Sequence, residues 1–341
     1  MTVIDPFGAA SDHDLPTVAL ALDPEEVRAE FKRGLPRLAG EQGIVKVKSI
    51  TVTRHKPGRR CVIEYDVRVE RPDEPRRKDK LIGKIRARRY GNEGYRMLEA
   101  VWNAGFHAES SDGISVPEPI GVLPRFKMWL QRKIVGAEAT TSLLQNDGTL
   151  LARRMAEAIH KLHTADVPSE RSHTMADELR ILHEHLPRVA EGKPELNQRI
   201  SRLLGVCDRL GTALPPPRTC GIHRDFYPAQ VLVNQDRIFL LDFDLYCQGD
   251  PALDAGNFLG HLGEMSVRHP RDSQALLDRG HAMEERFLEL AGPGTHPAVR
   301  AYTTLTLVRH VCLSTQFPER IPFTEALLDL CEQRLGKQSR S

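Results

Sequence analysis

Acidic, basic and amide side chains gather in one stretch of this sequence, residues 221–254, in an order that suits metal-assisted chemistry. Asp225 lies in a loop before an apolar strand pattern, and Asp242 directly follows the next such pattern. Two carboxylates at neighbouring strand ends allow one to take a proton from a reacting hydroxyl while the other binds a divalent cation. Isolated loop aspartates are usually turn residues, but His223 and Gln230 accompany this pair in one ordered frame. The stretch therefore predicts a catalytic site.

The order of these residues resembles the catalytic loop and the metal loop of the protein-kinase fold, H-x-D-x-x-x-x-N followed by D-x-D/G. In more detail, the segments 223–233, 241–244 and 249–255 resemble H-G-D-x-x-x-x-N-x-L-V, I-D-F/W-D/E and G-D-P-x-x-D-L-A. These are motifs of the aminoglycoside phosphotransferase and choline kinase family, whose members are small-molecule kinases. With looser signals in the preceding region, the resemblance spans about residues 43–263.

The resemblance implies a phosphotransferase that depends on ATP and Mg²⁺ and moves the γ-phosphate to a hydroxyl of a small molecule. The acceptor would be similar to an aminoglycoside, an amino alcohol or a sugar. The resemblance places Asp225 at the acceptor hydroxyl, and His223 as a brace of the catalytic loop. It assigns Asp242 and Gln230 to the metal, and Asp244 to the metal or the acceptor.

The sequence departs from the family pattern at two positions. Gln230 replaces Asn and is one methylene longer, although its amide keeps the carbonyl oxygen that binds a metal. Arg224 replaces the usual small residue between His and Asp. The alternative function is therefore a nucleotide-binding pseudokinase with a regulatory role. Asp254, in the third motif, is expected to stabilise the large lobe rather than contact the substrate.

The residues expected to hold the nucleotide phosphates lie earlier in the chain. Alternating patterns in residues 43–69 predict two antiparallel strands joined by the turn 54–60, which contains Gly58 and four Lys or Arg residues. At this position the family has a loop that covers the phosphates with backbone N–H groups and cations. A cationic hairpin without a ligand fits the same residues equally well.

Lys84 lies inside the apolar strand pattern of residues 81–85, where an unpaired ammonium group is costly to bury. It resembles the lysine of the V-A-I-K strand, which reaches the α and β phosphates. The alternative is a lysine at a sheet edge that faces water. Glu93, in the first turn of the predicted helix 92–104, would pair with Lys84. Glu99 is the other candidate, because one sequence does not fix the helix register.

The patterns predict an α+β, bilobal, protein-kinase-like fold, with a small antiparallel-sheet lobe followed by a larger, mainly helical lobe. In the family, a short segment between the lobes binds the edge of adenine through its backbone, and Leu130, Gln131 and Arg132 would supply these groups. The expected organisation is a flexible N-terminal arm, a nucleotide-binding lobe, and a catalytic and substrate-binding lobe, at residues 1–22, 23–130 and 131–341.

Bulk composition excludes several other classes of protein. The 341 residues are 40% hydrophobic, which is enough for two lobes with apolar cores. Since 48 basic residues balance 46 acidic ones, nothing indicates a nucleic-acid partner. No apolar run approaches the ~20 residues that span a bilayer, and the first residues lack signal-peptide features. We therefore expect a cytoplasmic protein that binds neither nucleic acid nor membrane.

Overall fold

The computed structural model describes residues 1–33, 35–72, 74–87 and 93–338, and they fall into two units. The first unit is Met1–Val135 and the second is Gly136–Ser341. The sequence patterns predict this division after residue 130, five positions earlier. Each unit has its own strands and helices, and each is described by itself below.

An antiparallel sheet forms the centre of the first unit. Alternation along β3 buries one face of the strand, at residues 61, 63, 65, 67 and 69, and leaves the intervening residues half-exposed. Among the described residues the strand order is β1-β2-β3-β4-β7-β6, with β1 and β2 parallel and the other pairs antiparallel. The elements are β1 (Thr2–Ile4), η1 (Ala9–Ser11), α1 (Thr17–Leu22), α2 (Pro24–Arg33), α3 (Pro36–Ala39), β2 (Ile44–Lys56), β3 (Arg60–Glu70), β4 (Arg77–Arg86), α4 (Glu93–Val101), η2 (Trp102–Phe106), β5 (Ile114–Ser115), β6 (Pro119–Leu123), η3 (Pro124–Phe126) and β7 (Met128–Arg132).

Residues 1–22, for which we expected a flexible arm, contain β1, η1 and α1. Val18, Ala21 and Leu22 of α1 are buried in the core of the first unit. The Tyr65 hydroxyl of β3 donates a hydrogen bond to the Ala21 carbonyl at 2.9 Å. A helix of six residues has little stability of its own, so packing on the sheet determines this element and local sequence signals do not reveal it.

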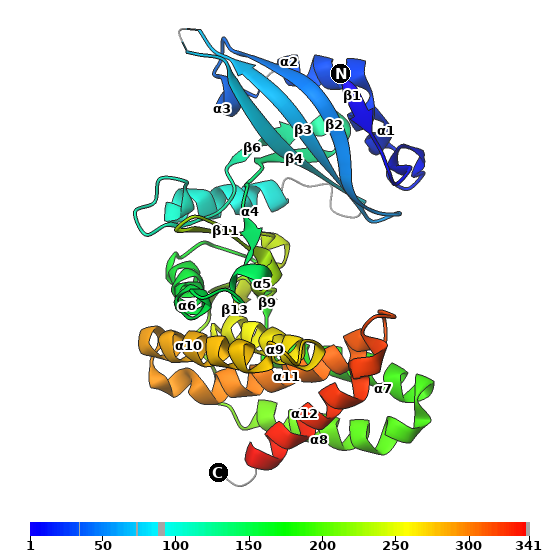
Figure 1. Cartoon of the computed structure of the whole chain (residues 1–341), viewed down its shortest axis with the longest axis vertical. Coiled ribbons are helices and arrows are strands. Elements are labelled where there is room, and N and C mark those ends of the chain that lie inside the picture. Colours follow the sequence, from blue (N-terminus) through cyan, green and yellow to red (C-terminus); the bar gives the residue numbers. More distant parts are fainter. Residues whose placement is uncertain (34, 73, 88–92, 339–341) are drawn as a thin grey trace. The chain divides into compact units, whose positions relative to one another are not determined.

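The second unit is mainly helical, and α9 packs closely between α10 and α11 (Figure 1). None of its described helices, nor any described helix of the first unit, is long and apolar enough to cross a membrane. The elements are β8 (Ala137–Glu138), α5 (Ala139–Ser142), α6 (Gly148–Thr164), β9 (Ser172–His173), α7 (Met175–Gly192), η4 (Pro194–Leu196), α8 (Asn197–Thr212), β10 (Cys220–Ile222), η5 (Pro228–Gln230), β11 (Val231–Asn234), β12 (Arg237–Leu240), η6 (Phe243–Leu245), β13 (Cys247–Gly249), α9 (Ala252–Arg268), α10 (Ser273–Ala291), η7 (Pro293–Thr295), α11 (His296–Ser314), η8 (Ile321–Phe323) and α12 (Thr324–Gln338).

The predicted hairpin is present in the second unit as β11 and β12, which pair from Val231 with Leu240 to Asn234 with Arg237. β8 adds to the free side of β11. The pairing continues one step past the strands, because the Leu241 N–H donates to the Gln230 carbonyl at 2.9 Å. The hairpin therefore fixes the chain on both sides of its base.

The close approach of α9 to α11 requires a glycine at position 256. A Cβ there would lie 2.5 Å from the Cβ of Tyr302 and 2.8 Å from the backbone nitrogen of Thr303. Because the backbone of a packed helix cannot move aside freely, we expect Gly256→Ala to lower the free energy of unfolding by about 2 kcal/mol in urea denaturation. The control is Gly205→Ala in α8, where the nearest atom is Arg209 Nη1 at 3.8 Å. It should be neutral or stabilising by up to about 1 kcal/mol, and equal losses in both variants would contradict the packing argument.

Candidate active site

The structure places the expected catalytic and metal-binding residues together, in the loops at the base of the β11–β12 hairpin. His223 and Asp225 follow β10, and Gln230 ends the short turn η5 before β11. Asp242 and Asp244 follow β12, where the chain makes the turn η6. All five residues belong to the second unit, so their arrangement is internal to that unit.

Asp254, at the start of α9, holds the loop that carries Asp225. Its carboxylate accepts the backbone N–H groups of His223, at 2.8 Å, and of Arg224, at 2.7 Å. A third bond, of 2.9 Å, comes from Nε2 of His163 on α6. The side chain of Asp254 is completely buried, so these bonds are shielded from water. Asp254 stabilises the large unit, in agreement with the expectation from the sequence.

His223 joins the catalytic loop to the segment that carries Asp242. Its Nε2–H donates to the carbonyl of Leu241 at 2.7 Å. The ring is buried, with centroids 6.0 Å from Phe226 and 5.0 Å from Phe243, and Nδ1 has no hydrogen-bond partner among the described residues. His223 therefore positions the loop, and this geometry supports the bracing role that the resemblance implied.

Two residues of this region have left-handed backbone conformations. Arg224 has a φ of 70° and Asp242 a φ of 59°. A short polar residue such as Asp tolerates this conformation, whereas Arg is disfavoured in it. The left-handed turn at Arg224 accounts for the small residue, Gly, in the family motif at this position. Such strain is typical of functional sites and persists because surrounding contacts, here the Asp254 bonds, impose it.

The carboxyl of Asp225 lies in an environment that disfavours its charge. Burial raises its pKa, and the nearby charge of Asp242 raises it further, while Arg309 acts in the opposite direction. The structure thus brings the two aspartates close enough to repel each other. A divalent cation between or beside them would relieve this repulsion, so the donor set fits a metal.

Gln230 lies beside this aspartate pair. Its Nε2 is 3.5 Å from Oδ2 of Asp225 and 3.5 Å from the hydroxyl of Tyr227. Across the described residues, no group of three or more His, Cys, Asp or Glu side chains is arranged to hold a metal. Mg²⁺ does not need such a cluster, because one or two protein carboxylates suffice when phosphates and water complete its shell. Asp242, with the Gln230 amide oxygen, fits that smaller requirement.

Hydrogen bonds from Arg171, the residue before β9, fix the segment that carries Asp244. Arg171 donates from Nη1 to the Asp244 carbonyl at 2.8 Å and from Nη2 to the Tyr246 carbonyl at 2.7 Å. The Tyr246 hydroxyl in turn donates to the Val167 carbonyl at 2.8 Å. These bonds fix the backbone around the second acid of the Asp-Phe-Asp sequence.

A buried polar network that the sequence patterns do not predict supports the catalytic loop. Asn257 of α9 donates from Nδ2 to the Phe226 carbonyl at 2.9 Å, and Arg309 of α11 donates to the Asn257 side-chain oxygen. Arg309 also binds Glu178 at 3.2 Å, and Glu178 accepts a bond of 2.7 Å from His173. One signal was available, since Asn257 follows Asp254 by three positions in an otherwise apolar stretch of helix.

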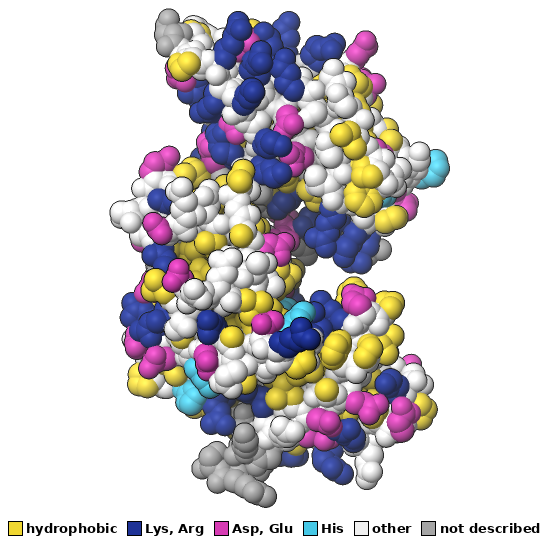
Figure 2. All heavy atoms as spheres, viewed as in Figure 1, with side chains coloured by type: hydrophobic (Ala, Val, Ile, Leu, Met, Phe, Trp, Pro, Cys, Tyr) yellow, Lys and Arg dark blue, Asp and Glu magenta, His cyan; other side chains and the backbone are white. Residues whose placement is uncertain are grey.

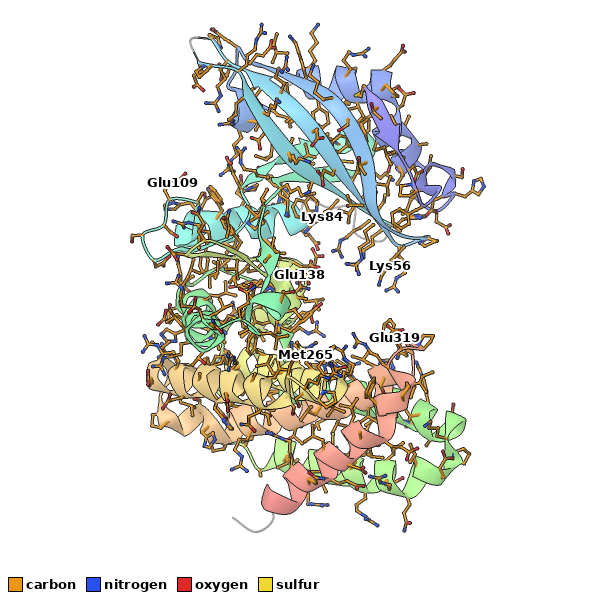
Figure 3. All side chains as sticks on the ribbon, in the orientation of Figure 1. Lys56, Lys84, Glu109, Glu138, Met265 and Glu319 are labelled. Carbon is orange, nitrogen blue, oxygen red and sulfur yellow. The ribbon has the colours of Figure 1, made fainter. Side chains whose placement is uncertain are left out.

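In the first unit, Lys84 lies on β4 with its Nζ 4.7 Å from the centre of the Trp129 ring (Figure 3). Of the two glutamates considered as its partner, Glu99 is engaged elsewhere, in an ion pair of 2.9 Å with Arg37. Glu93 is the first residue of α4 and is exposed. A Lys84–Glu93 pair remains a prediction from the resemblance.

The β2–β3 turn differs from the expected phosphate-binding loop in one respect. Gly58 has the left-handed φ of 63° that a tight turn needs, but its N–H donates to Oδ2 of Asp12 at 2.9 Å. The same carboxylate is 2.7 Å from Nε2 of His55. The expected backbone donor is thus used within the unit. The turn still carries four Lys or Arg residues, and burial together with the neighbouring charges of Arg60, Arg54 and Arg59 lowers the pKa of Lys56. Figure 2 shows basic side chains gathered in the first unit.

The backbone groups expected to bind adenine lie in the interior of a sheet. β7 is paired on both sides, Leu130 with Gly83 of β4 and with Gly121 of β6. Gln131 likewise has partners on both strands, and the Arg132 N–H donates to the Glu118 carbonyl at 2.9 Å. The strand continues to Arg132, and the Lys133 N–H still donates to the Lys80 carbonyl at 2.8 Å, so adenine binding by residues 130–132 stays a prediction.

Comparison with known proteins identifies the family. The model of the phosphotransferase enzyme family matches residues 95–302, which is more than half of the chain, so the chain belongs to this family. The predictions of the family and of a small-molecule kinase are thereby confirmed. A search of curated protein sequences found no match.

Solved structures with the same fold have low sequence identity to this chain. A choline/ethanolamine kinase family protein from Mesorhizobium loti is 15% identical with a TM-score of 0.57, and the match covers 91% of this chain and 94% of that one. The choline kinase from Cryptosporidium parvum Iowa II is 13% identical with a TM-score of 0.54, covering 92% and 96%. A thermostable mutant of aminoglycoside phosphotransferase APH(4)-Ia, in a ternary complex with AMP-PNP and hygromycin B, is 15% identical with a TM-score of 0.56, covering 85% and 94%. These similarities confirm the predicted kinase-like fold.

The environment of Asp225 leads to a prediction about stability. Because the native state raises the pKa of this carboxyl above 3.8, its charged form destabilises the fold, and the loss begins as pH rises above 3.8 and is complete once pH passes the native pKa. We expect Asp225→Asn to be more stable than the wild type at pH 7, by about 0.5–2 kcal/mol, as found when strained functional groups are removed. The gain should shrink as pH falls toward 3.8. Urea denaturation at pH 7 and pH 4.5 measures both, and a variant less stable at pH 7 would contradict the raised pKa.

Proposed function

We propose that this protein is a kinase that uses ATP and Mg²⁺ to phosphorylate a hydroxyl group of a small molecule. The observation that carries the proposal is the approach of Asp225 and Asp242 at the base of one hairpin, close enough for the Asp242 charge to raise the Asp225 pKa. The His223–Leu241 bond links the two loops. Support also comes from the family and from a fold relative whose structure contains AMP-PNP and hygromycin B.

In the proposed reaction, Asp225 orients the acceptor hydroxyl and accepts its proton. The hydroxyl oxygen forms a bond to the γ-phosphorus of ATP, the bond from that phosphorus to the β,γ-bridging oxygen breaks, and ADP leaves with the electron pair. Burial of Asp225 raises its pKa, and a base with a higher pKa accepts the hydroxyl proton more readily. Mg²⁺, when bound, neutralises charge on the phosphate oxygens, and Asp242 and Gln230 would hold it, with Asp244 nearby.

The first unit supplies cations that suit the phosphates of a nucleotide. Lys84 is the proposed partner of the α and β phosphates, with its aliphatic chain and ammonium beside Trp129. The basic turn between β2 and β3, which includes Lys56, would add positive charge. The Gly58 N–H would not contribute a bond to the phosphates, because it already donates to Asp12. Long-range attraction of this kind concentrates an anionic nucleotide even before specific contacts form.

The metal role of Asp242 is tested by calorimetric titration of Mg·ATP into the wild type and into Asp242→Ala. We expect the variant to lose at least tenfold in affinity, because an ion–carboxylate contact of this kind contributes about 1.5–3 kcal/mol. Asp236→Ala is the matched control, since Asp236 lies exposed in the turn of the same hairpin, away from the base. Equal affinity in all three proteins would remove Asp242 from the metal site.

The role of Asp225 is tested by turnover. ADP release is first screened against sugars, amino alcohols and aminoglycosides, and the best acceptor is then used with Asp225→Asn. We expect kcat to fall by about 10²–10⁴, the usual contribution of a positioned base, while Mg·ATP affinity is retained. A variant with wild-type turnover would exclude Asp225 as the base. Binding of Mg·ATP with no transfer to any acceptor would instead indicate a pseudokinase.

A further inference from the structure

Four polar residues lie on one face of α9 and lead away from the catalytic loop. Asn257, His261, Glu264 and Arg268 are spaced at intervals of four, three and four positions, which places them in one row along a helix. We call this row the α9 stripe. It begins at the catalytic loop, because Asn257 binds the Phe226 carbonyl at 2.9 Å. Met265, labelled in Figure 3, lies on the same helix.

The middle of the α9 stripe forms a stacked aromatic pair beside the proposed base. The ring of His261 stacks on Tyr227, with centroids 4.3 Å apart and an angle of 11° between the planes. The Tyr227 hydroxyl is 3.5 Å from the Gln230 amide, which is itself 3.5 Å from Asp225. The stacked pair therefore adjoins the position where an acceptor hydroxyl would react.

His310 of α11 holds His261 in this orientation. The two rings meet edge to face, with centroids 4.4 Å apart and an angle of 90°. His310 is only 2% exposed, and among the described residues neither of its ring nitrogens has a hydrogen-bond partner. Burial lowers the pKa of His310 to about 3 and also lowers the pKa of His261, so both rings are neutral at physiological pH. The stacked pair is therefore uncharged.

The far end of the α9 stripe has more positive than negative charge. The buried carboxylate of Glu264 binds Nε of Arg268 at 2.6 Å and lies 3.7 Å from Nη1 of Arg320. Two guanidinium groups thus share one carboxylate, and Arg320, with 30% of its side chain exposed, has the longer and weaker contact. Arg320 also lies over the ring of Phe317, 5.2 Å from its centroid. Figure 2 shows basic and histidine side chains close together on the second unit.

The buried carboxylates near the α9 stripe are already engaged. Asp254 accepts two backbone N–H groups and a bond from His163. Glu178 binds His173 and Arg309, and Glu264 has the two arginines described above. Among the buried groups of the stripe, an ammonium group on an acceptor would therefore meet guanidinium groups rather than a carboxylate that is ready to pair with it, whereas a carboxylate on an acceptor would meet Arg320. Glu319, which precedes Arg320 in the chain, is exposed.

We propose that the acceptor of this kinase is a flat hydroxylated carboxylate, with its hydroxyl at Asp225, its planar part against the outer side of the Tyr227–His261 stack, and its carboxylate at Arg320. The inference rests on the proposed function, because it describes the second substrate of the same site. The seven residues from Asn257 to Glu264 rise about 10 Å along the helix, which sets the separation between the hydroxyl and the carboxylate of the acceptor. Arg320 is then a residue that determines specificity.

The test compares three probes that differ only in the charge of one end. They are 4′-(hydroxymethyl)biphenyl-4-carboxylate, the corresponding carboxamide and the corresponding aminomethyl compound, whose length is comparable to the separation above. Dissociation constants are measured by ligand-observed NMR with Mg²⁺ and a non-hydrolysable ATP analogue present, so that the catalytic aspartates do not attract the amine. We expect the carboxylate to bind the wild type roughly tenfold more tightly than the other two, the value of one charge-assisted pair.

Variants then locate the preference. Arg320→Gln should abolish it, and Arg320→Glu should shift it toward the amine. Arg202→Glu makes the same charge change at an exposed position of α8 and should leave the preference unaltered. Thermal unfolding of each variant verifies that it is folded.

Three outcomes overturn the proposal: the amine or the amide binds the wild type as tightly as the carboxylate, none of the three probes binds, or Arg320→Gln keeps the preference. Failure of the proposed function is recognised separately, because the wild type would then not bind Mg·ATP at all.

Discussion

The buried carboxylate of Asp254 is the interaction on which the candidate active site depends. It accepts the backbone N–H groups of two successive residues, His223 and Arg224, and so determines the path of the chain just before Asp225. Peptide N–H groups buried without an acceptor would each destabilise the fold by about 1–3 kcal/mol. The left-handed conformation of Arg224 persists because this carboxylate requires it. The strained backbone at Arg224 and the fixed path of the chain into Asp225 thus have the same cause.

Around this centre, other buried polar groups connect helices to loops. The His223 ring links the catalytic loop to the chain before Asp242, and Asn257 with Arg309 links the loop to α9 and α11. The rigid part is the helical pair, whose close contact depends on Gly256. Loops supply the reactive groups and packed helices hold them still, which is the usual way in which a scaffold provides precision.

The same arrangement places groups of like charge near each other. Asp225 and Asp242 destabilise each other without a cation, which is the situation expected of a site that binds metal and nucleotide. Along α9 the balance of charge reverses, since two arginines share Glu264. The described residues thus place anionic groups at one end of this region and a surplus of cationic groups at the other. In the proposed function, charge would contribute to the choice of substrate as well as to catalysis.

The sequence by itself determined the chemistry-bearing loop and the class of fold. His223, Asp225, Gln230 and Asp242 were recognised because their spacing around two apolar strands is local, and a two-strand hairpin brings its own ends together. The small sheet and the helical unit followed from periodicity, which is also a local property. Gly58 and β7 show the limit of this reasoning, since their positions in the chain were identified but the partners of their backbone groups were not.

Only the tertiary structure decided which distant residues meet. The Asp12 carboxylate takes the Gly58 N–H, α1 packs on the sheet, and the bonds of Asp254 reach over 30 positions along the chain. The stacked rings of Tyr227 and His261 and the approach of Arg320 to Glu264 likewise join segments that no local pattern relates. The physical reason is that burial and hydrogen bonding act through space, whereas propensity and periodicity act along the chain.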